Sequence, residues 1–233
     1  MIPTYNEREN ISELIPKVLS SYPGIHVLVV DDDSEDGTGK IAEEMVSRFP
    51  NLHVFHRKGK RGRGFAGIEG FQWAIQKGFV PVLEMDADFS HDPQVMPVFL
   101  EEIQKHDVVI GSRFIPGGGQ KGRGAPRVLL SGFTNGFLRF LFGFKAYDCT
   151  SGFRCFKKQV LQSMLFDRMI SKGPSIVIEV LYHCHRERAD IKEIPIIFED
   201  RQKGQSKLNS TKLFDTLGVA MRLRFQNPVS SSK

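Results

Sequence analysis

The chain has 233 residues, 40% hydrophobic and 25% charged, which suits one globular domain with a substantial core. Its net charge of +5 is uneven: residues 1–111 carry 11 Lys and Arg against 18 Asp and Glu, whereas residues 112–233 carry 21 against 9. The three cysteines have neither CxxC nor zinc-ligand spacing, which argues against a disulfide framework and a zinc finger. The sequence contains no run of 18 apolar residues, so we expect no transmembrane helix, and we expect no signal peptide.

Short β-branched runs alternate with stretches of helical period in the first half of the chain. The predicted strands are 25–30, 52–55, 79–85 and 107–111, and the predicted helices are 37–49, 65–78 and 93–104. Gly78 is typical of a helix end, and Asp92 followed by Pro93 is typical of a helix start. The alternation predicts an α/β fold with a mainly parallel sheet flanked by helices, and ligands at the carboxyl ends of the strands.

The rhythm changes after Gly111. A loop rich in Gly and Pro (115–126) leads to an apolar, basic stretch at 127–144, for which a helix on a membrane surface and a buried core helix both stay open. Further helices and a strand at 191–198 follow. The polar segment 199–210 has no periodicity, so we expect a mobile loop before a last helix.

Two carboxylates end the strand at 79–85, in the stretch "LEMDADFSHDP" (83–93). Asp86 and Asp88 are two residues apart, so both can point to one face and approach one hard cation such as Mg²⁺ or Mn²⁺. The alternative is a pair of solvated turn residues. Asp92 is most simply a helix cap, and His91 is most simply a loop residue.

Two further motifs lie near phosphate-binding positions of α/β folds. In "VVDDDSEDGT" (29–38), aspartates occupy the place where a dinucleotide fold needs glycines, which suits hydrogen bonds to a base or ribose. "GRGFAG" (62–67) matches GxGxxG, but the basic run 57–61 separates it from its strand. We interpret it as a loop that allows close backbone approach to a phosphate-bearing ligand.

Seven blocks then carry a resemblance that covers nearly the whole chain. They are "PTYNERENI" (3–11), "VVDDDSEDGT", "GRGFAGIEG" (62–70), "MDADFSHDP" (85–93), "GSRF" (111–114), "TSGFR" (150–154) and "DRQKGQSK" (200–207). Their order resembles that of family 2 glycosyltransferases, and most closely the dolichyl-phosphate (polyprenyl-phosphate) mannosyltransferase catalytic subunits. The resemblance implies a single GT-A domain over 1–233, with a nucleotide-sugar half (1–111) and an acceptor half (112–233).

The resemblance also implies a reaction and its residues. Mannose would pass with inversion from GDP-mannose to dolichyl (polyprenyl) phosphate, with Mg²⁺ or Mn²⁺ as cofactor. By family pattern, the residues around the guanosine would be Pro3, Tyr5, Glu7, Val30 and Asp32. The diphosphate would contact Asp86, Ala87 and Asp88, with both aspartates on the metal, and the donor sugar and diphosphate would contact Arg113, Arg201 and Lys207. The acceptor phosphate would be bound by Arg127 and Ser131. Catalysis would rest on Asp88, Arg113, Arg201 and Lys207.

The expected mechanism needs no general base. Related polysaccharide synthases use a carboxylate base and a QxxRW motif, whereas this chain has "TSGFR" where the acid would stand and a single Trp73 in "GFQWA". A phosphate acceptor is already ionised at neutral pH. A lipid acceptor implies a peripheral membrane location on the cytosolic face (endoplasmic reticulum in a eukaryote), with small membrane-anchoring subunits as partners.

One departure and two alternatives remain. The family has a complete strand before "PTYNE", whereas only Met1 and Ile2 precede it here, so we expect a truncated sequence or a weakened sheet edge that holds residues 3–7 less firmly. Another donor (UDP-glucose) or a bacterial carrier lipid is the nearest alternative. A nucleic-acid-binding protein is the distant one, based on the basic half and "HRKGKRGRG" (56–64), although a solvated loop explains that run and we expect no nucleic-acid partner.

Overall fold

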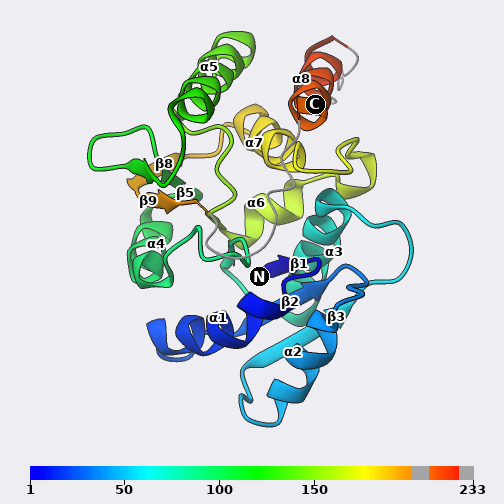
Figure 1. Ribbon diagram of the computed structural model, residues 1–233. Helices are drawn as coiled ribbons and strands as arrows, with labels where there is room; N and C mark the ends of the chain where they lie inside the picture. Colours follow the sequence, from blue (N-terminus) through cyan, green and yellow to red (C-terminus); the bar gives the residue numbers. More distant parts are fainter. Residues whose placement is uncertain (201–209, 226–233) are drawn as a thin grey trace.

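The first three strands form a parallel sheet in the computed structural model, which describes residues 1–200 and 210–225 (Figure 1). They are β1 (Ile2–Thr4), β2 (Val27–Asp31) and β3 (Leu52–His56), with Ile2 opposite Val29 and Val27 opposite Leu52. Every residue of β1 and β2 is buried, as expected for parallel strands covered on both faces. The helices α1 (Arg8–Ser21), α2 (Thr38–Val46) and α3 (Arg63–Lys77) follow these strands in turn.

A second sheet has the strand order β4-β7-β5-β8. Its strands are β4 (Val82–Glu84), β5 (Val108–Ser112), β7 (Arg154–Phe156) and β8 (Ile191–Pro195). Strand β7 runs antiparallel to both neighbours, and β5 and β8 are parallel. The mainly parallel α/β arrangement that the sequence predicts is confirmed.

Strand β1 connects the two sheets. The Met1 nitrogen donates to the Leu83 carbonyl at 2.7 Å, and the Met85 amide donates to the Met1 carbonyl at 3.1 Å. Strand β1 therefore lies between β2 and β4. The expectation of a weakened sheet edge at this strand is wrong, because β1 occupies an interior position with a hydrogen-bonded neighbour on each side.

The remaining elements lie mostly in the second half. They are η1 (Pro93–Val95), α4 (Met96–Lys105), β6 (Gly119–Lys121), α5 (Ala125–Phe142), α6 (Lys158–Ser163), η2 (Phe166–Arg168), α7 (Ile176–Arg186), β9 (Ile197–Glu199) and α8 (Ser210–Phe225). The strand predicted at 191–198 is divided: β8 pairs with β5, β9 pairs with β6, and the amide of Ile196 between them donates to Ser112 at 3.0 Å.

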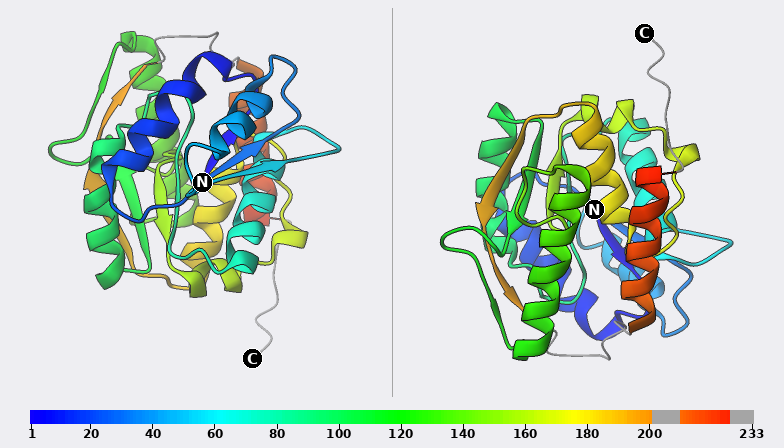
Figure 2. Two further views of the ribbon diagram at one scale, coloured as in Figure 1. Left: turned by 90° about the horizontal axis from the view of Figure 1, so that it is seen from below. Right: turned by 90° about the horizontal axis from the view of Figure 1, so that it is seen from above.

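Helices cover the strands on both sides (Figure 2), and a hydrophobic core lies on each face of the sheet. Val29 and Val30 are consecutive in β2 and belong to different cores, as the alternation of side chains along a strand requires. One core takes apolar residues from α3, α6 and α7, and the other takes them from α1, α2 and α4. Helix α1 is absent from the elements predicted above, although its buried residues Ile11, Leu14, Ile15 and Val18 follow a helical period.

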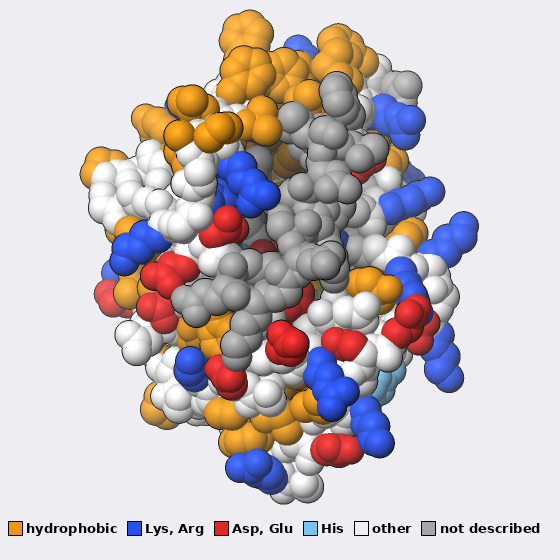
Figure 3. Space-filling model, viewed as in Figure 1, with side chains coloured by type: hydrophobic (Ala, Val, Ile, Leu, Met, Phe, Trp, Pro, Cys, Tyr) orange, Lys and Arg blue, Asp and Glu red, His pale blue; other side chains and the backbone are white. Residues whose placement is uncertain are grey.

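Helix α5 presents an apolar face to solvent. Leu129, Phe133 and Phe140 are 73%, 71% and 89% exposed, whereas Thr134 and Leu138 face inward. Figure 3 shows hydrophobic side chains gathered at the end of the molecule where Figure 1 places α5 and α8. The buried-core interpretation of residues 127–144 is therefore wrong. Among the described residues, every helix is too short or too polar to cross a bilayer.

Candidate active site

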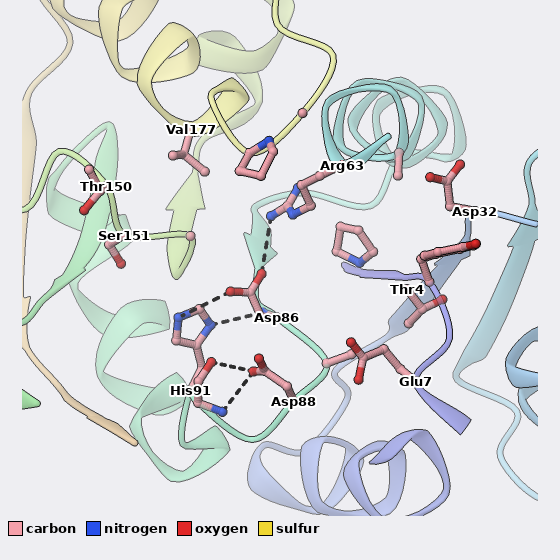
Figure 4. Close-up of a pocket in the computed structure, with 18 of the residues that line it drawn as sticks. Thr4, Glu7, Asp32, Arg63, Asp86, Asp88, His91, Thr150, Ser151 and Val177 are labelled. Carbon is pink, nitrogen blue, oxygen red and sulfur yellow. Dashed lines mark hydrogen bonds and ion pairs between the residues drawn. The ribbon is translucent and has the colours of Figure 1, made fainter. Parts of the chain in front are cut away.

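The carboxyl ends of β1, β2 and β4 border a cavity of about 570 Å³. Parallel strands place their carboxyl ends at one edge of a sheet, which is where α/β folds bind ligands. Figure 4 shows Thr4, Glu7 and Asp32 on one side of this cavity, Asp86 and Asp88 in the middle, and Thr150 and Ser151 on the other side. Of the residues predicted from the sequence, those that line it are Pro3, Tyr5, Glu7, Asp32, Asp86, Ala87, Asp88 and Arg113.

Asp86 and Asp88 are the central acidic groups of the cavity. The Asp86 side chain is 39% exposed and points into the open space, whereas Asp88 is nearly buried. Among residues 1–200 and 210–225, no three His, Cys, Asp or Glu side chains are grouped so as to hold a metal. Two carboxylates still fit a hard cation such as Mg²⁺ or Mn²⁺, provided that substrate oxygens and water complete its coordination.

Ser90 and His91 hold these carboxylates in place. The Ser90 amide and hydroxyl donate to one Asp88 oxygen at 3.1 and 2.5 Å. His91 is buried, stacks on Phe153 at 4.8 Å, and accepts a hydrogen bond at Nδ1 from the Asp86 amide at 3.0 Å. Burial lowers the pKa of His91, and this effect outweighs that of Asp86 and Asp88, which act to raise it. His91 lies in a loop, as the sequence predicts, but it is buried there and its ring supports the backbone of Asp86.

Pro3, Tyr5, Glu7 and Asp32 line the cavity, and Figure 4 shows Glu7 and Asp32 on the side opposite Thr150. Strand β1 and the turn after it carry the first three, and the turn after β2 carries Asp32. Val30 lies outside this group: its side chain is fully buried in the hydrophobic core and is absent from the cavity lining. The side chain of Val30 therefore does not reach the cavity, and the predicted contact of Val30 with the nucleotide stays a prediction.

The arginines of the basic run are paired with acids. Arg57 forms a buried ion pair with Asp32 and a second one with Glu69 at 2.6 Å. Arg61 contacts Glu35 at 2.6 Å and Asp33 at 3.0 Å. A nucleic-acid interface needs cations that are available to phosphate. These pairs therefore give the run a role in holding the acidic turn after β2.

The glycines of "GRGFAG" serve a different contact from the one predicted. A Cβ at Gly62 would overlap the carbonyl of Lys172, and one at Gly64 would overlap the carbonyl of Ser171. The Gly64 amide donates to the Lys172 carbonyl at 3.1 Å, while the Gly62 amide donates to Asp32 at 2.6 Å. The close backbone approach seen in the structure is thus to the segment before α7. Gly62 also lines the cavity, so the predicted approach to a phosphate-bearing ligand stays a prediction.

Arg113 is fixed by a partner that the sequence analysis did not identify. Its guanidinium contacts both oxygens of buried Asp148 at 2.7 Å and donates to the Thr150 hydroxyl at 2.7 Å. The guanidinium keeps the pKa of Asp148 below its usual value, in opposition to the effect of burial. Arg113 therefore lines the cavity as a pre-oriented cation.

The second half contributes more basic groups near the mouth. Arg123 lines the cavity, which the sequence analysis did not predict, and stacks over Phe198 at 4.9 Å. Arg127 and Ser131 on α5 are absent from the lining, although Arg127 reaches the lining residue Asp200 at 3.3 Å. Arg201 and Lys207, and the mobile loop expected around them, lie outside the described residues.

Comparison with known proteins gives the class of this fold and site. Residues 1–165 match Glycosyl transferase family 2. The chain belongs to this family of glycosyltransferases.

Three characterised relatives extend the match. The chain is 36% identical over 93% of its length to the polyprenol monophosphomannose synthase of Mycolicibacterium smegmatis, covering 83% of that protein. It is 37% identical over 90% of its length to the undecaprenyl-phosphate mannosyltransferase of Micrococcus luteus, covering 86% of it. It is 34% identical over 96% of its length to the dolichol-phosphate mannosyltransferase of Pyrococcus furiosus, covering 62% of it. The predicted family resemblance is confirmed.

Solved structures of glucosyl-3-phosphoglycerate synthase from Mycobacterium tuberculosis share the fold. The complex with Mn²⁺ and UDP-glucose superposes with a TM-score of 0.69 at 17% identity, over 98% of this chain and 79% of that one. The complex with phosphoglyceric acid gives 0.69 at 16% identity, over 96% and 78%. These similarities confirm the GT-A fold.

Proposed function

We propose that this enzyme transfers mannose from GDP-mannose to the phosphate of a polyprenyl lipid such as dolichyl phosphate, with inversion at the sugar carbon. The observation that carries the proposal is the order of groups across one cavity: Glu7 and Asp32 on one side, a carboxylate pair in the middle, and Thr150, to which Arg113 is bonded, on the other side. That order suits a nucleotide sugar on one side and an anionic acceptor on the other. The names of the relatives, which specify mannose and lipid phosphates, support the same substrates.

The donor's guanosine is proposed to lie against Pro3, Tyr5, Glu7 and Asp32. Glu7 is held by the Asn10 amide at 2.8 Å, and Asp32 by Arg57 and the Gly62 amide. Carboxylates oriented in this way suit the N–H donors of a guanine or the hydroxyls of a ribose.

Asp86 and Asp88 would hold a divalent ion, Mg²⁺ or Mn²⁺, together with the diphosphate oxygens. Such an ion neutralises negative charge that grows on the departing diphosphate. Ala87 between them is small and buried, so the backbone admits the diphosphate. Arg201 and Lys207, outside the described residues, stay proposed partners of the same diphosphate.

The acceptor phosphate is proposed to be bound by Arg127 and Ser131 of α5, whereas Arg113 stays a proposed partner of the donor sugar and diphosphate. Thr150, Ser151 and Gly152 form the wall where related enzymes have an acidic base. A phosphate oxygen is ionised at neutral pH and attacks the sugar carbon as the bond to the diphosphate breaks, so no proton has to be removed. Arg113, already oriented by Asp148, would stabilise the charge that grows on the diphosphate.

A lipid acceptor also implies a membrane surface. The exposed face of α5 combines Leu129, Phe133 and Phe140 with Arg139, a composition that suits the headgroup boundary of an anionic membrane. We propose a peripheral association on the cytosolic side, aided by small anchoring subunits.

The test incubates the protein with Mg²⁺ or Mn²⁺, labelled GDP-mannose and a short-chain polyprenyl phosphate. We expect the wild type to form a mannolipid. Asp88→Asn should lose activity by about 100-fold or more, because one proposed ligand of the metal that neutralises the diphosphate is gone. Asp167→Asn, at an exposed position in η2, is the matched control and keeps full activity. Absence of the mannolipid from the wild-type chain overturns the proposal, and unchanged activity in Asp88→Asn overturns the metal assignment.

UDP-glucose is the second candidate donor, because the M. tuberculosis structure that shares this fold contains it. Excess unlabelled UDP-glucose in the same assay distinguishes the two. If UDP-glucose competes strongly and labelled UDP-glucose gives a glucolipid, UDP-glucose becomes the proposed donor in place of GDP-mannose.

A further inference from the structure

Arg63 is a cation that lies beside the proposed metal ligands, with 20% of its side chain exposed. It is the first residue of α3, and its side chain turns into the cavity between β4 and the loop at Gly152 (Figure 4). Its Nη1 donates to Glu84 at 2.8 Å, and its Nη2 lies 3.6 Å from an Asp86 oxygen. Because Glu84 and Asp86 are two residues apart on one strand line, a single guanidinium spans both.

The two nitrogens of Arg63 are used unequally. The ion pair with Glu84 is nearly buried, and it needs only Nη1. Nη2 is buried and has no hydrogen-bond partner among the described residues, because 3.6 Å to Asp86 is too long for one. A buried donor without a partner is unfavourable unless a ligand or water supplies the acceptor.

The surroundings identify the ligand that would satisfy this donor. Asp86 is half-exposed to the cavity, so an anion that reaches Asp86 through a divalent ion also comes within reach of Nη2. A diphosphate offers several anionic oxygens, and arginine binds such oxygens with strong, directional hydrogen bonds. Glu84 keeps the guanidinium in place before any ligand arrives.

We propose that Arg63 is a fixed cation of the donor site, which binds the diphosphate of the nucleotide sugar directly and competes with the divalent ion for Asp86. This inference rests on the proposed function, since it assumes a nucleoside diphosphate donor. It gives the enzyme nucleotide affinity that does not depend on a metal. It also makes metal binding weak until diphosphate oxygens take the place of Asp86 as the acceptor nearest Nη2.

The experiment measures GDP binding by isothermal titration calorimetry, once in EDTA and once with saturating Mn²⁺. It also measures the binding of Mn²⁺ alone, from the electron paramagnetic resonance signal of the free ion. The main variant is Arg63→Met with Glu84→Met, which replaces the buried pair by side chains of similar length and avoids an unpaired buried Glu84. Glu101→Met with Lys105→Met, an exposed pair on α4, is the matched control. Arg63→Lys is a second variant, which keeps the positive charge and disturbs folding least.

The double variant is expected to bind GDP about tenfold more weakly in EDTA, and much less so with Mn²⁺. It is also expected to bind Mn²⁺ alone about threefold more tightly, because the competing cation is gone. Arg63→Lys should retain most of the metal-free GDP affinity. If the ion pair were purely structural, its removal would change the affinities for GDP and for Mn²⁺ in the same direction, or would change neither.

Equal GDP affinity of wild type and double variant in EDTA overturns the inference, as does an equal loss with and without Mn²⁺. Wild-type binding of GDP that requires Mn²⁺ absolutely also overturns it, and leaves the proposed function standing. Failure of the wild type to bind GDP under either condition overturns the GDP donor itself, and the inference with it.

Discussion

Single buried acids hold the walls of the cavity in position. Glu179 of α7 is fully buried and accepts hydrogen bonds from the Ile170 amide at 2.9 Å and the Ser171 amide at 2.7 Å. The same segment packs against the backbone of Gly62 and Gly64 and leads to the lining residue Pro174. Glu179 therefore acts on the site through the backbone it holds.

Glu179→Gln replaces one acceptor oxygen by a donor that faces a backbone amide. We expect the free energy of unfolding to fall by about 1–3 kcal/mol, measured by urea denaturation. Glu187→Gln, at an exposed position just after α7, should change it by less than about 0.5 kcal/mol. A stability of Glu179→Gln equal to that of the wild type would show that the carboxylate does not hold this segment.

The arginines show what a sequence leaves open. "MDADFSHDP" and "TSGFR" were enough to predict the carboxylates proposed for the metal and the wall proposed to lack a base, because these features depend on neighbouring residues along the chain. The partners of Arg57, Arg63 and Arg113 lie 25, 21 and 35 positions away. A long guanidinium can reach many such partners, so only the packed fold determines which acid it meets.

At the scale of elements, close packing between α3 and the segment before α7 sets the shape of the cavity. A Cβ at Gly64 would meet the backbone carbonyl of Ser171, and a carbonyl has no freedom to rotate away as a side chain would. By contrast, Gly136 on α5 has open space around its Cα. Identical substitutions in the two helices should therefore have opposite effects.

Gly64→Ala is expected to lower the free energy of unfolding by about 1–3 kcal/mol, as overpacking does. Gly136→Ala should raise it by about 0.5–1 kcal/mol, because alanine favours the helix. Urea denaturation of both variants under one condition checks the pair. A stabilised Gly64→Ala would mean that α3 and the Ser171 segment move apart freely.

The helices were predictable to different degrees. The period of apolar residues predicted α2, α3 and α4 within a few residues, and Asp92 caps η1 through the Gln94 amide as expected. Helix α1 follows a similar period, but the motif that precedes it and Pro16 within it obscure the pattern. The division of 191–198 into β8 and β9 depends on two separate pairing partners, β5 and β6, that local sequence does not encode.

For the whole molecule, the exposed face of α5 predicts where a membrane would meet it. Phe133→Glu with Phe140→Glu should abolish most sedimentation with vesicles that contain anionic lipid, since two apolar side chains are lost from the contact. Activity toward a water-soluble short-chain acceptor should persist.

Val98→Glu is the control for this membrane test, because Val98 is an exposed apolar residue on α4, 45% accessible, and outside α5. It should sediment with vesicles as the wild type does. Equal binding of vesicles by the double variant would assign the membrane contact to another face.

The interior place of β1 has a consequence for synthesis on the ribosome. Residues 1–4 leave the ribosome before both of their neighbours in the sheet, near Val29 and Leu83. One side of this segment can pair once β2 has left the exit tunnel, but the side that meets β4 stays unpaired until residue 85 has left it, exposed to other chains. The pairing of this segment with β4 is therefore a late step in the folding of the first half, and a chaperone would matter most before it.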